Sequence, residues 1–180
     1  MDDITRAAGV AKGTFYLYFA EKREVYHEVI RGFMQLIHDT GATVADKGAA
    51  VTPSEFFARA ERVAQDLMKV FLQNRELARL AYREAMGLDP EIEAMMRGFY
   101  HQIARVAAKN IEIGIKVGIV RRCNPLVVAY AQIGMVERVL LALIERPQEF
   151  PSPEEVVREV LRMAFEGVSV PGGFSPYRVA

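Results

Sequence analysis

Cysteine is scarce in this 180-residue chain, which contains one, Cys123. A single thiol forms neither an internal disulfide nor a cysteine metal site, and this favours a reducing compartment such as the cytosol. An excess of one charge sign is also lacking, since 23 basic side chains balance 23 acidic ones. A chain without net charge has no overall attraction for nucleic acid, so any DNA contact must come from a local arrangement of side chains.

Long hydrophobic runs are lacking as well. The longest uncharged stretch covers residues 123–136 and contains Asn, Pro and Gln, which makes it too short and too polar to span a bilayer. Asp2 and Asp3 follow Met1 directly, where a signal peptide would carry a basic segment and then an apolar one. We therefore expect a cytoplasmic protein without a membrane partner.

The sequence has no repeats or biased tracts, and 51% of its residues are hydrophobic. These properties exclude disordered, fibrous and solenoid proteins. Common catalytic motifs are missing too: the chain has no phosphate-binding glycine loop, no HExxH and no nucleophile elbow. The histidines His27, His38 and His101 share no metal-ligand spacing, so we expect no metal. Because the catalytic and phosphate-binding motifs are missing, we also expect no enzymatic activity and no cofactor.

Apolar residues recur every three or four positions along most of the chain, which predicts an all-α fold. The expected helices cover residues 22–39, 53–71, 74–86, 90–117, 125–145 and 153–165. Asp89, Asn124 and Ser152 each precede a proline, a pattern typical of a helix N-terminus. Residues 111–117 also alternate as a strand would, but no second candidate strand exists to pair with them. We interpret them as helix, ended by Gly118.

Residues 2–22 predict two short helices joined by a turn at Gly9, where glycine supplies the positive φ of a tight turn. The apolar side of this pair consists of Ile4, Ala8, Val10, Phe15 and Phe19. The other side of the second helix carries short, donor-rich or aromatic residues suited to phosphates and base edges, namely Lys12, Gly13, Thr14, Tyr16 and Tyr18. The alternative is an ordinary helical corner with surface tyrosines.

The segment Ile4-x-x-x-Ala8-Gly9-Val10-Ala11-Lys12-Gly13-Thr14-Phe15-Tyr16-Leu17-Tyr18-Phe19-x-x-Lys22 resembles the helix-turn-helix signature of the tetracycline-repressor (TetR) family of transcriptional regulators. The resemblance implies that the second short helix reads DNA through the five residues above and that Lys22 binds phosphate. It also implies three regions: the DNA-binding region with its connecting helix at 1–40, an effector-binding and dimerisation domain at 41–170, and a tail at 171–180.

The chain departs from the family pattern at three points. Thr5 stands where the family usually has Ala, and Ala11 stands where Ser or Thr often caps the second helix, a loss of ~1 kcal/mol. The family's first helix has no counterpart, because the chain starts at the second. Two functions therefore stay open. One is a regulator, most simply a repressor released from a palindromic operator by a small apolar or amphipathic effector. The other is a dimeric ligand-binding or scaffold protein that lost operator binding with that helix.

Methionine and aromatic residues of the middle helices are the candidates for an effector pocket, which the resemblance places between these helices. They are Met68, Phe71, Tyr82, Met86, Met95, Met96, Phe99 and Tyr100; the alternative for each is ordinary core packing. Residues 126–144 are apolar on nearly all sides and need cover all round. A homodimer that pairs the last two helices, as the resemblance implies, would supply it through Leu126, Tyr130, Ile133, Leu140, Ile144, Val157, Leu161 and Phe165. The alternative is a central helix buried within one subunit.

Overall fold

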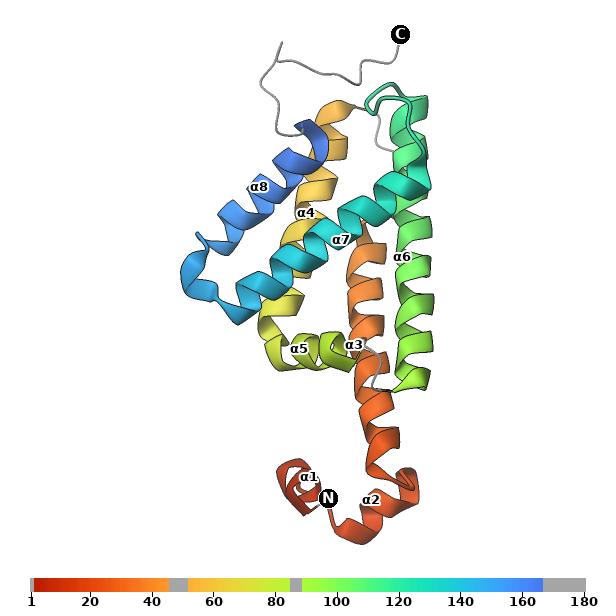
Figure 1. The fold of residues 1–180 in the computed structure, drawn as a ribbon, viewed down its shortest axis with the longest axis vertical. Coiled ribbons are helices and arrows are strands. Elements are labelled where there is room, and N and C mark those ends of the chain that lie inside the picture. The colour runs from red at the N-terminus through yellow and green to blue at the C-terminus, as the bar shows by residue number, and fades with distance from the viewer. Residues whose placement is uncertain (1, 46–51, 85–88, 167–180) are drawn as a thin grey trace.

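A computed structural model describes residues 2–45, 52–84 and 89–166, and all regular structure within these ranges is helical. This confirms the all-α prediction (Figure 1). The helices are α1 (Asp2–Ala8), α2 (Lys12–Tyr18), α3 (Lys22–Ala45), α4 (Pro53–Gln73), α5 (Arg75–Glu84), α6 (Pro90–Lys116), α7 (Pro125–Glu145) and α8 (Pro153–Glu166), with a short 3-10 turn at Pro147–Glu149.

The helices form two unequal parts. The short helices α1 and α2 lie together at one end of the molecule, and α3 leads from them into a bundle formed with α4 to α8 (Figure 1). Within the bundle α6 packs along α7, α3 packs along α4, and α4 also contacts α8. With 24 residues, α3 is about 36 Å long, so it spans both parts.

Local capping explains where four of the helices begin. The Asp89 carboxylate accepts the backbone N–H groups of Glu91 and Ile92, and the Asn124 side chain does the same for the start of α7. The Ser152 hydroxyl accepts the N–H of Glu155 at 3.3 Å. These three predicted starts are confirmed. At α4 the cap is Thr52, which forms a reciprocal capping box with Glu55.

One predicted helix end differs from the structure by several residues. The first long helix, expected to end at residue 39, continues through Gly41 to Ala45. The helix expected over 74–86 is described over Arg75–Glu84, and its last two predicted residues lie outside the described ranges, as does the predicted tail at 171–180. At the end of α6, by contrast, Gly118 has a φ of 79°, so the predicted glycine terminus is confirmed.

Three apolar clusters hold the bundle together. The first joins α3, α5 and α6 around Ile30 and Ile92, both fully buried, and reaches Ile144 of α7. The second joins α4, α7 and α8 around Met68 and Leu140. The third lies between α6 and α7 and consists of three alanines and Ile111. The bundle core therefore continues along α3 and α6, the two helices that position the sites described below.

Length and composition alone would allow α7 to cross a membrane, and within the described ranges it is the one helix of this kind. Glu137 and Arg138 lie past the middle of α7. Its buried positions, Ala129 and Leu140 among them, pack against α6 and α8. These contacts hold α7 within the helical bundle.

Candidate nucleic-acid interface and ligand site

The α1–α2 pair has the geometry predicted for a helix-turn-helix. Gly9 has a φ of 66° in the turn, and the Val10 N–H donates to the Thr5 carbonyl at 3.0 Å. Thr5 is buried at the crossing of the helices, and its hydroxyl donates to the Asp2 carbonyl at 3.2 Å. The departure at Thr5 is therefore accommodated, because the hydroxyl finds an acceptor inside its own helix.

Phe15 holds α2 in place. Its ring is buried and lies 5.4 Å from that of Phe19. The rest of the predicted apolar side is less covered than expected: Ile4 is half-buried, whereas Ala8 and Val10 are exposed. Ala11 precedes α2 in extended conformation without a side-chain cap, which agrees with the missing Ser or Thr.

The outer side of α2 is open to a partner. All six residues predicted to contact DNA, Lys12, Gly13, Thr14, Tyr16, Tyr18 and Lys22, are exposed. Tyr16 is 49% exposed and Tyr18 77%. A Cβ built on Gly13 meets nothing within 4 Å among the described residues, so packing gives no reason for a glycine there. Such a position suits close approach by another molecule.

Leu17 belongs to the same surface and was not predicted. Leu17 is 82% exposed and lies between the two tyrosines. A large apolar side chain is unfavourable in water, and this one is suited to contact a thymine methyl group. Leu17 could have been found from its position, because Phe15 already forms the buried side of this seven-residue helix and Leu17 lies outside that side.

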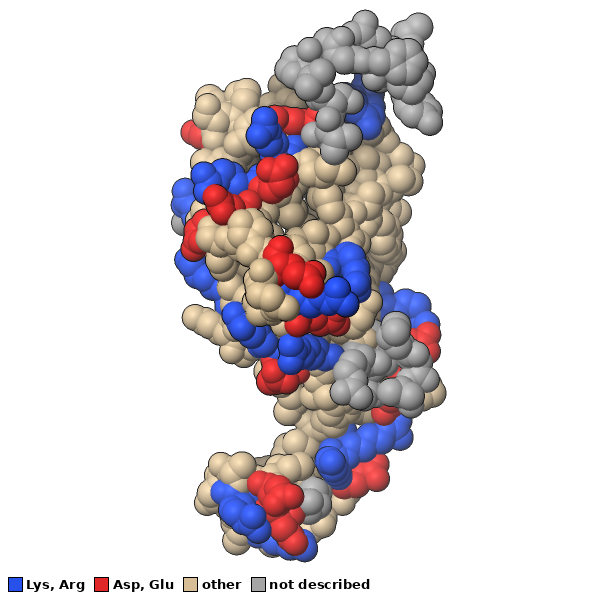
Figure 2. All heavy atoms as spheres, turned by 60° about the vertical axis from the view of Figure 1, so that its left-hand side comes forward, with Lys and Arg blue, Asp and Glu red and all other residues tan. Residues whose placement is uncertain are grey.

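The cations at this end are paired in the free protein. Lys12 Nζ lies 2.9 Å from Asp2 Oδ1, and Arg6 lies 3.4 Å from Asp3. The hydrogen bond and the charge attraction raise the pKa of Lys12 and lower that of Asp2. Blue and red side chains accordingly alternate over α1 and α2 in Figure 2. A phosphate group would have to replace Asp2 as the partner of Lys12.

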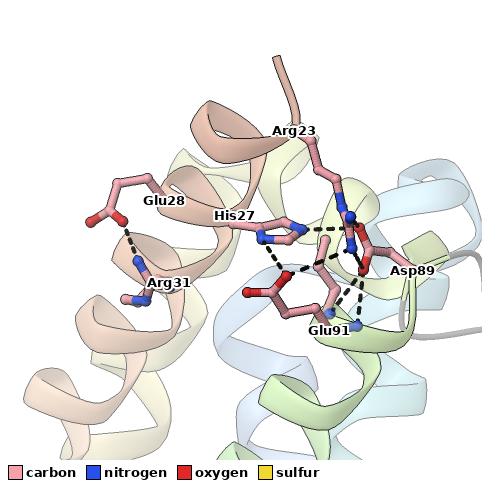
Figure 3. Close-up of polar contacts among 7 residues, drawn as sticks. Arg23, His27, Glu28, Arg31, Asp89 and Glu91 are labelled. Atoms are coloured by element: carbon pink, nitrogen blue, oxygen red, sulfur yellow. Dashed lines mark hydrogen bonds and ion pairs between the residues drawn. The ribbon is translucent and has the colours of Figure 1, made fainter. Parts of the chain in front are cut away.

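A polar cluster joins the start of α3 to the start of α6 (Figure 3). We call Arg23, His27, Asp89 and Glu91 the Asp89 junction. Arg23 donates from Nε to one Asp89 oxygen at 2.8 Å and from Nη2 to the other at 2.9 Å. His27 Nε2 lies 2.9 Å from Asp89 Oδ2, while Glu91 lies 3.5 Å from His27 and 3.6 Å from Arg23.

Asp89 stays ionised at neutral pH. The Arg23 guanidinium, and after it His27, holds the pKa of this carboxyl well below its usual range. Asp89 was predicted only as a helix cap. Its partners on α3 were missed because they lie 62 and 66 residues away in sequence.

Two of the predicted effector residues, Met96 and Tyr100, line a hollow of about 420 Å³ between α6 and α7. Glu93, Arg97, Tyr130, Ile133, Gly134 and Glu137 complete its lining. Tyr100 donates its hydroxyl to Glu137, and burial together with this bond raises the pKa of Tyr100. The phenol therefore remains a hydrogen-bond donor. Glu137 was not predicted, since the sequence alone does not show which face of α7 meets α6.

The other predicted effector residues do not join this hollow. Tyr82 lines a second one of about 270 Å³ with residues of α5 and α7. Met68 is buried in the α4–α7–α8 core, and Phe71, Met95 and Phe99 pack half-buried against the core clusters. Met86 lies outside the described residues. The structure thus divides the predicted set between two hollows and the core.

Comparison with known proteins connects this geometry to a family. Residues 1–29, which comprise α1, α2 and the start of α3, match the model of the bacterial regulatory proteins of the tetR family. The chain is also 25% identical over 170 residues to the uncharacterized HTH-type transcriptional regulator YhgD of Bacillus subtilis, covering 91% of this chain and 82% of that protein.

The chain is thus similar to transcriptional regulators of the tetR family, whose model its helix-turn-helix matches. Its fold also agrees with several solved structures. The transcriptional regulator FadR from Bacillus subtilis, in complex with stearoyl-CoA, superposes with a TM-score of 0.74 at 16% identity, covering 93% of this chain and 87% of that one. AibR, in complex with isovaleryl coenzyme A and operator DNA, superposes with a TM-score of 0.67 at 17% identity, covering 91% and 85%.

The predicted subunit-contact residues of this chain occupy different environments. Leu126 and Tyr130 are exposed on α7, and Ile133, Leu161 and Phe165 are half-buried. Leu140, Ile144 and Val157 are buried in the core of the subunit itself. Since a second subunit can reach only uncovered side chains, the exposed and half-buried residues of α7 and α8 are those available for pairing.

Proposed function

We propose that this chain is a cytoplasmic, homodimeric regulator that binds a palindromic operator through α2 and is released from it by a small effector. The observation that carries the proposal is the exposed set on α2, with Tyr16 and Tyr18 beside an unpacked Gly13, on a helix held by buried Phe15. The match of this segment to the tetR family model supports it. Repression is the simplest function for a DNA-binding protein that an effector releases from its operator.

Specific binding follows from the pairing of two such helices. In a dimer, two copies of α2 held one DNA turn apart would read the two halves of a palindrome in successive major grooves. The exposed apolar side chains of α7 and α8, Leu126, Tyr130 and Met163 among them, support pairing through these helices. Their burial against a second subunit would remove that apolar area from water.

Effector control needs only that the ligand favour the geometry that does not bind DNA. A ligand wedged between the middle helices would tilt α3, which carries α2, and would change the spacing of the two recognition helices. We propose an apolar or amphipathic effector with an acyl chain. The apolar side chains Met96 and Ile133 in the hollow support this class, as do the acyl-CoA ligands of FadR and AibR.

A dimeric ligand-binding or scaffold protein without operator binding remains the second candidate function. The ion pairs Lys12–Asp2 and Arg6–Asp3 favour it, because they occupy cations of the α1–α2 end. The two candidates differ in one respect: a regulator selects a DNA sequence, and a scaffold does not.

The test is selection of random-sequence DNA duplexes by the full chain, followed by the same selection with Tyr16→Ala. We expect the wild-type chain to enrich a palindrome. We expect the variant to enrich nothing while keeping the dimer mass of the wild type by light scattering, because Tyr16 is exposed and supports no core contact of the bundle. Specific enrichment by the variant would remove Tyr16 from the interface, and failure of both chains would favour the scaffold.

A further inference from the structure

We propose that the Asp89 junction is a positioning device that fixes the direction in which α3 carries α2 away from the bundle, and thereby sets operator affinity. This inference rests on the function proposed above. Arg23 and Asp89 act here as positioning residues, since the contacts that they make join α3 to α6 and not to a ligand.

The place of the junction along α3 supports this role. Arg23 is the second residue of α3 and lies five residues after the last residue of α2. The first fully buried apolar residue of α3 is Ile30, about two helical turns farther into the bundle. The junction is therefore the fixed point nearest to α2, and a small rotation about it is magnified at the recognition helix.

The contact between Arg23 and Asp89 fixes the orientation of α3 relative to α6. A guanidinium that donates from two nitrogens to both oxygens of one carboxylate fixes an angle as well as a distance. The side chains of His27 and Asp89 are 9% and 14% exposed, so solvent screens the contact between these two less than an ordinary surface ion pair, whereas the Arg23 side chain is half exposed. His27 adds a second contact from the next turn of α3 to the same carboxylate.

The other end of the junction reaches the effector hollow. Asp89 caps α6, and Met96 and Tyr100 on that same helix line the hollow between α6 and α7. Movement of the start of α6 on ligand binding would change the Arg23–Asp89 contact directly. The junction thus offers a short physical connection between the ligand site and α3, through one rigid helix and one polar contact.

A matched control lies on the same helix. Glu28 and Arg31 form an ion pair within α3, with both side chains more than half exposed (Figure 3). This pair joins α3 to no other element, so Arg31→Gln removes an arginine from α3 without touching the junction. Asp89→Asn in turn removes the charge but keeps an N-cap, since asparagine caps helices as well as aspartate does.

The experiment measures distance distributions in the free protein and affinities for the enriched operator duplex. Spin labels on Ala7→Cys and Gln102→Cys, both exposed, report the placement of α1 relative to α6 in a Cys123→Ser background. Unlabelled chain is added to suppress distances between subunits. The variants are Arg23→Gln, Asp89→Asn, their combination, and Arg31→Gln.

We expect Arg23→Gln and Asp89→Asn each to broaden the distance distribution and to weaken operator binding about tenfold, within the range of coupling between sites. The double variant should resemble the single ones, since both break one contact. Arg31→Gln should leave the distribution unchanged. A simple charge effect predicts the opposite sign for Asp89→Asn, because removing a negative charge would strengthen DNA binding.

Unchanged distributions in both junction variants would overturn the proposal, as would tighter operator binding by Asp89→Asn. The spin-label result does not depend on DNA. Failure of the wild-type chain to enrich an operator would therefore contradict the proposed function, while the distance distributions would still decide whether the junction positions α3.

Discussion

Lys22 begins α3 directly after the loop that follows α2, and its side chain is exposed. If it binds an operator phosphate, Lys22→Ala should reduce the slope of log affinity against log salt concentration by ~0.9, the value for one phosphate contact. Titrations of the enriched duplex at four salt concentrations measure the slope. Lys69→Ala on α4, a lysine that lies 3.2 Å from Asp66, is the control and should leave it unchanged. Equal slopes for Lys22→Ala and wild type would remove Lys22 from the interface.

Because of Asp89, the stability of the bundle should decrease as the pH becomes acidic. Its pKa in the folded chain is lowered from an ordinary value of 3.8, so its contribution is present above that value and is lost as pH falls toward the folded pKa. We expect the difference in urea midpoint between wild type and Asp89→Asn to narrow as pH falls below 3.8. A difference that stayed constant down to pH 2.5 would show that the carboxylate charge contributes nothing.

At the residue scale, features within one short motif could be predicted from the sequence, whereas contacts between residues far apart in the chain could not. The exposed set on α2 could be predicted because its residues lie within one motif of about 20 positions. The contact between Arg23 and Asp89 could not be predicted, because it joins residues 66 apart that meet only when α3 packs against α6. Nothing in the local pattern distinguishes Arg23 from the exposed Arg31.

Helix starts were predictable at the element scale, whereas one helix end was not. A start is marked by a side chain that accepts free N–H groups, as Asp89 and Asn124 do here. The helix expected to end at residue 39 continues through Gly41, which lacks the positive φ of a glycine terminus. One glycine costs ~1 kcal/mol in a helix, which the packing of a 24-residue helix can exceed.

Two glycines of α6 give opposite predictions for the same substitution. A Cβ built on Gly114 would lie 2.5 Å from Val120 Cγ2 and 3.3 Å from Val120 Cβ, so the turn that closes α6 would have to shift. We expect Gly114→Ala to lower the free energy of unfolding by about 1–3 kcal/mol. Gly98 is exposed, and a Cβ built on it meets nothing within 4 Å among the described residues. Gly98→Ala should therefore raise the free energy of unfolding by up to ~1 kcal/mol. Urea unfolding of both variants measures the two changes, and equal effects would contradict the close approach at Gly114.

At the scale of the whole molecule, self-association decides whether two recognition helices can act together. Tyr130 on α7 is 42% exposed and Val106 on α6 is 39% exposed, so the two side chains are matched in exposure. If α7 and α8 pair the subunits, Tyr130→Asp should weaken the dimer at least tenfold, because an unpaired charge would be buried. Val106→Asp should leave the dimer intact. Sedimentation at several concentrations distinguishes the two, and equal dissociation would place the contact elsewhere.

The sequence did not separate pocket-lining residues from core residues in the middle helices. Methionines and aromatic residues at helical spacing were candidates for one pocket, but they pack partly into the core and partly around two hollows. A stripe of such residues has the same pattern in both roles. Which side chains face a hollow depends on how α6 meets α7, and this is a property of the assembled bundle.

The most direct test of the account compares two affinities at one salt concentration. The full chain is titrated onto the enriched palindrome and onto a scrambled duplex of the same length and composition. A regulator that reads bases through α2 should prefer the palindrome by about a thousandfold or more. Equal affinities for the two duplexes would contradict operator recognition and would leave a dimeric ligand-binding protein as the function of this chain.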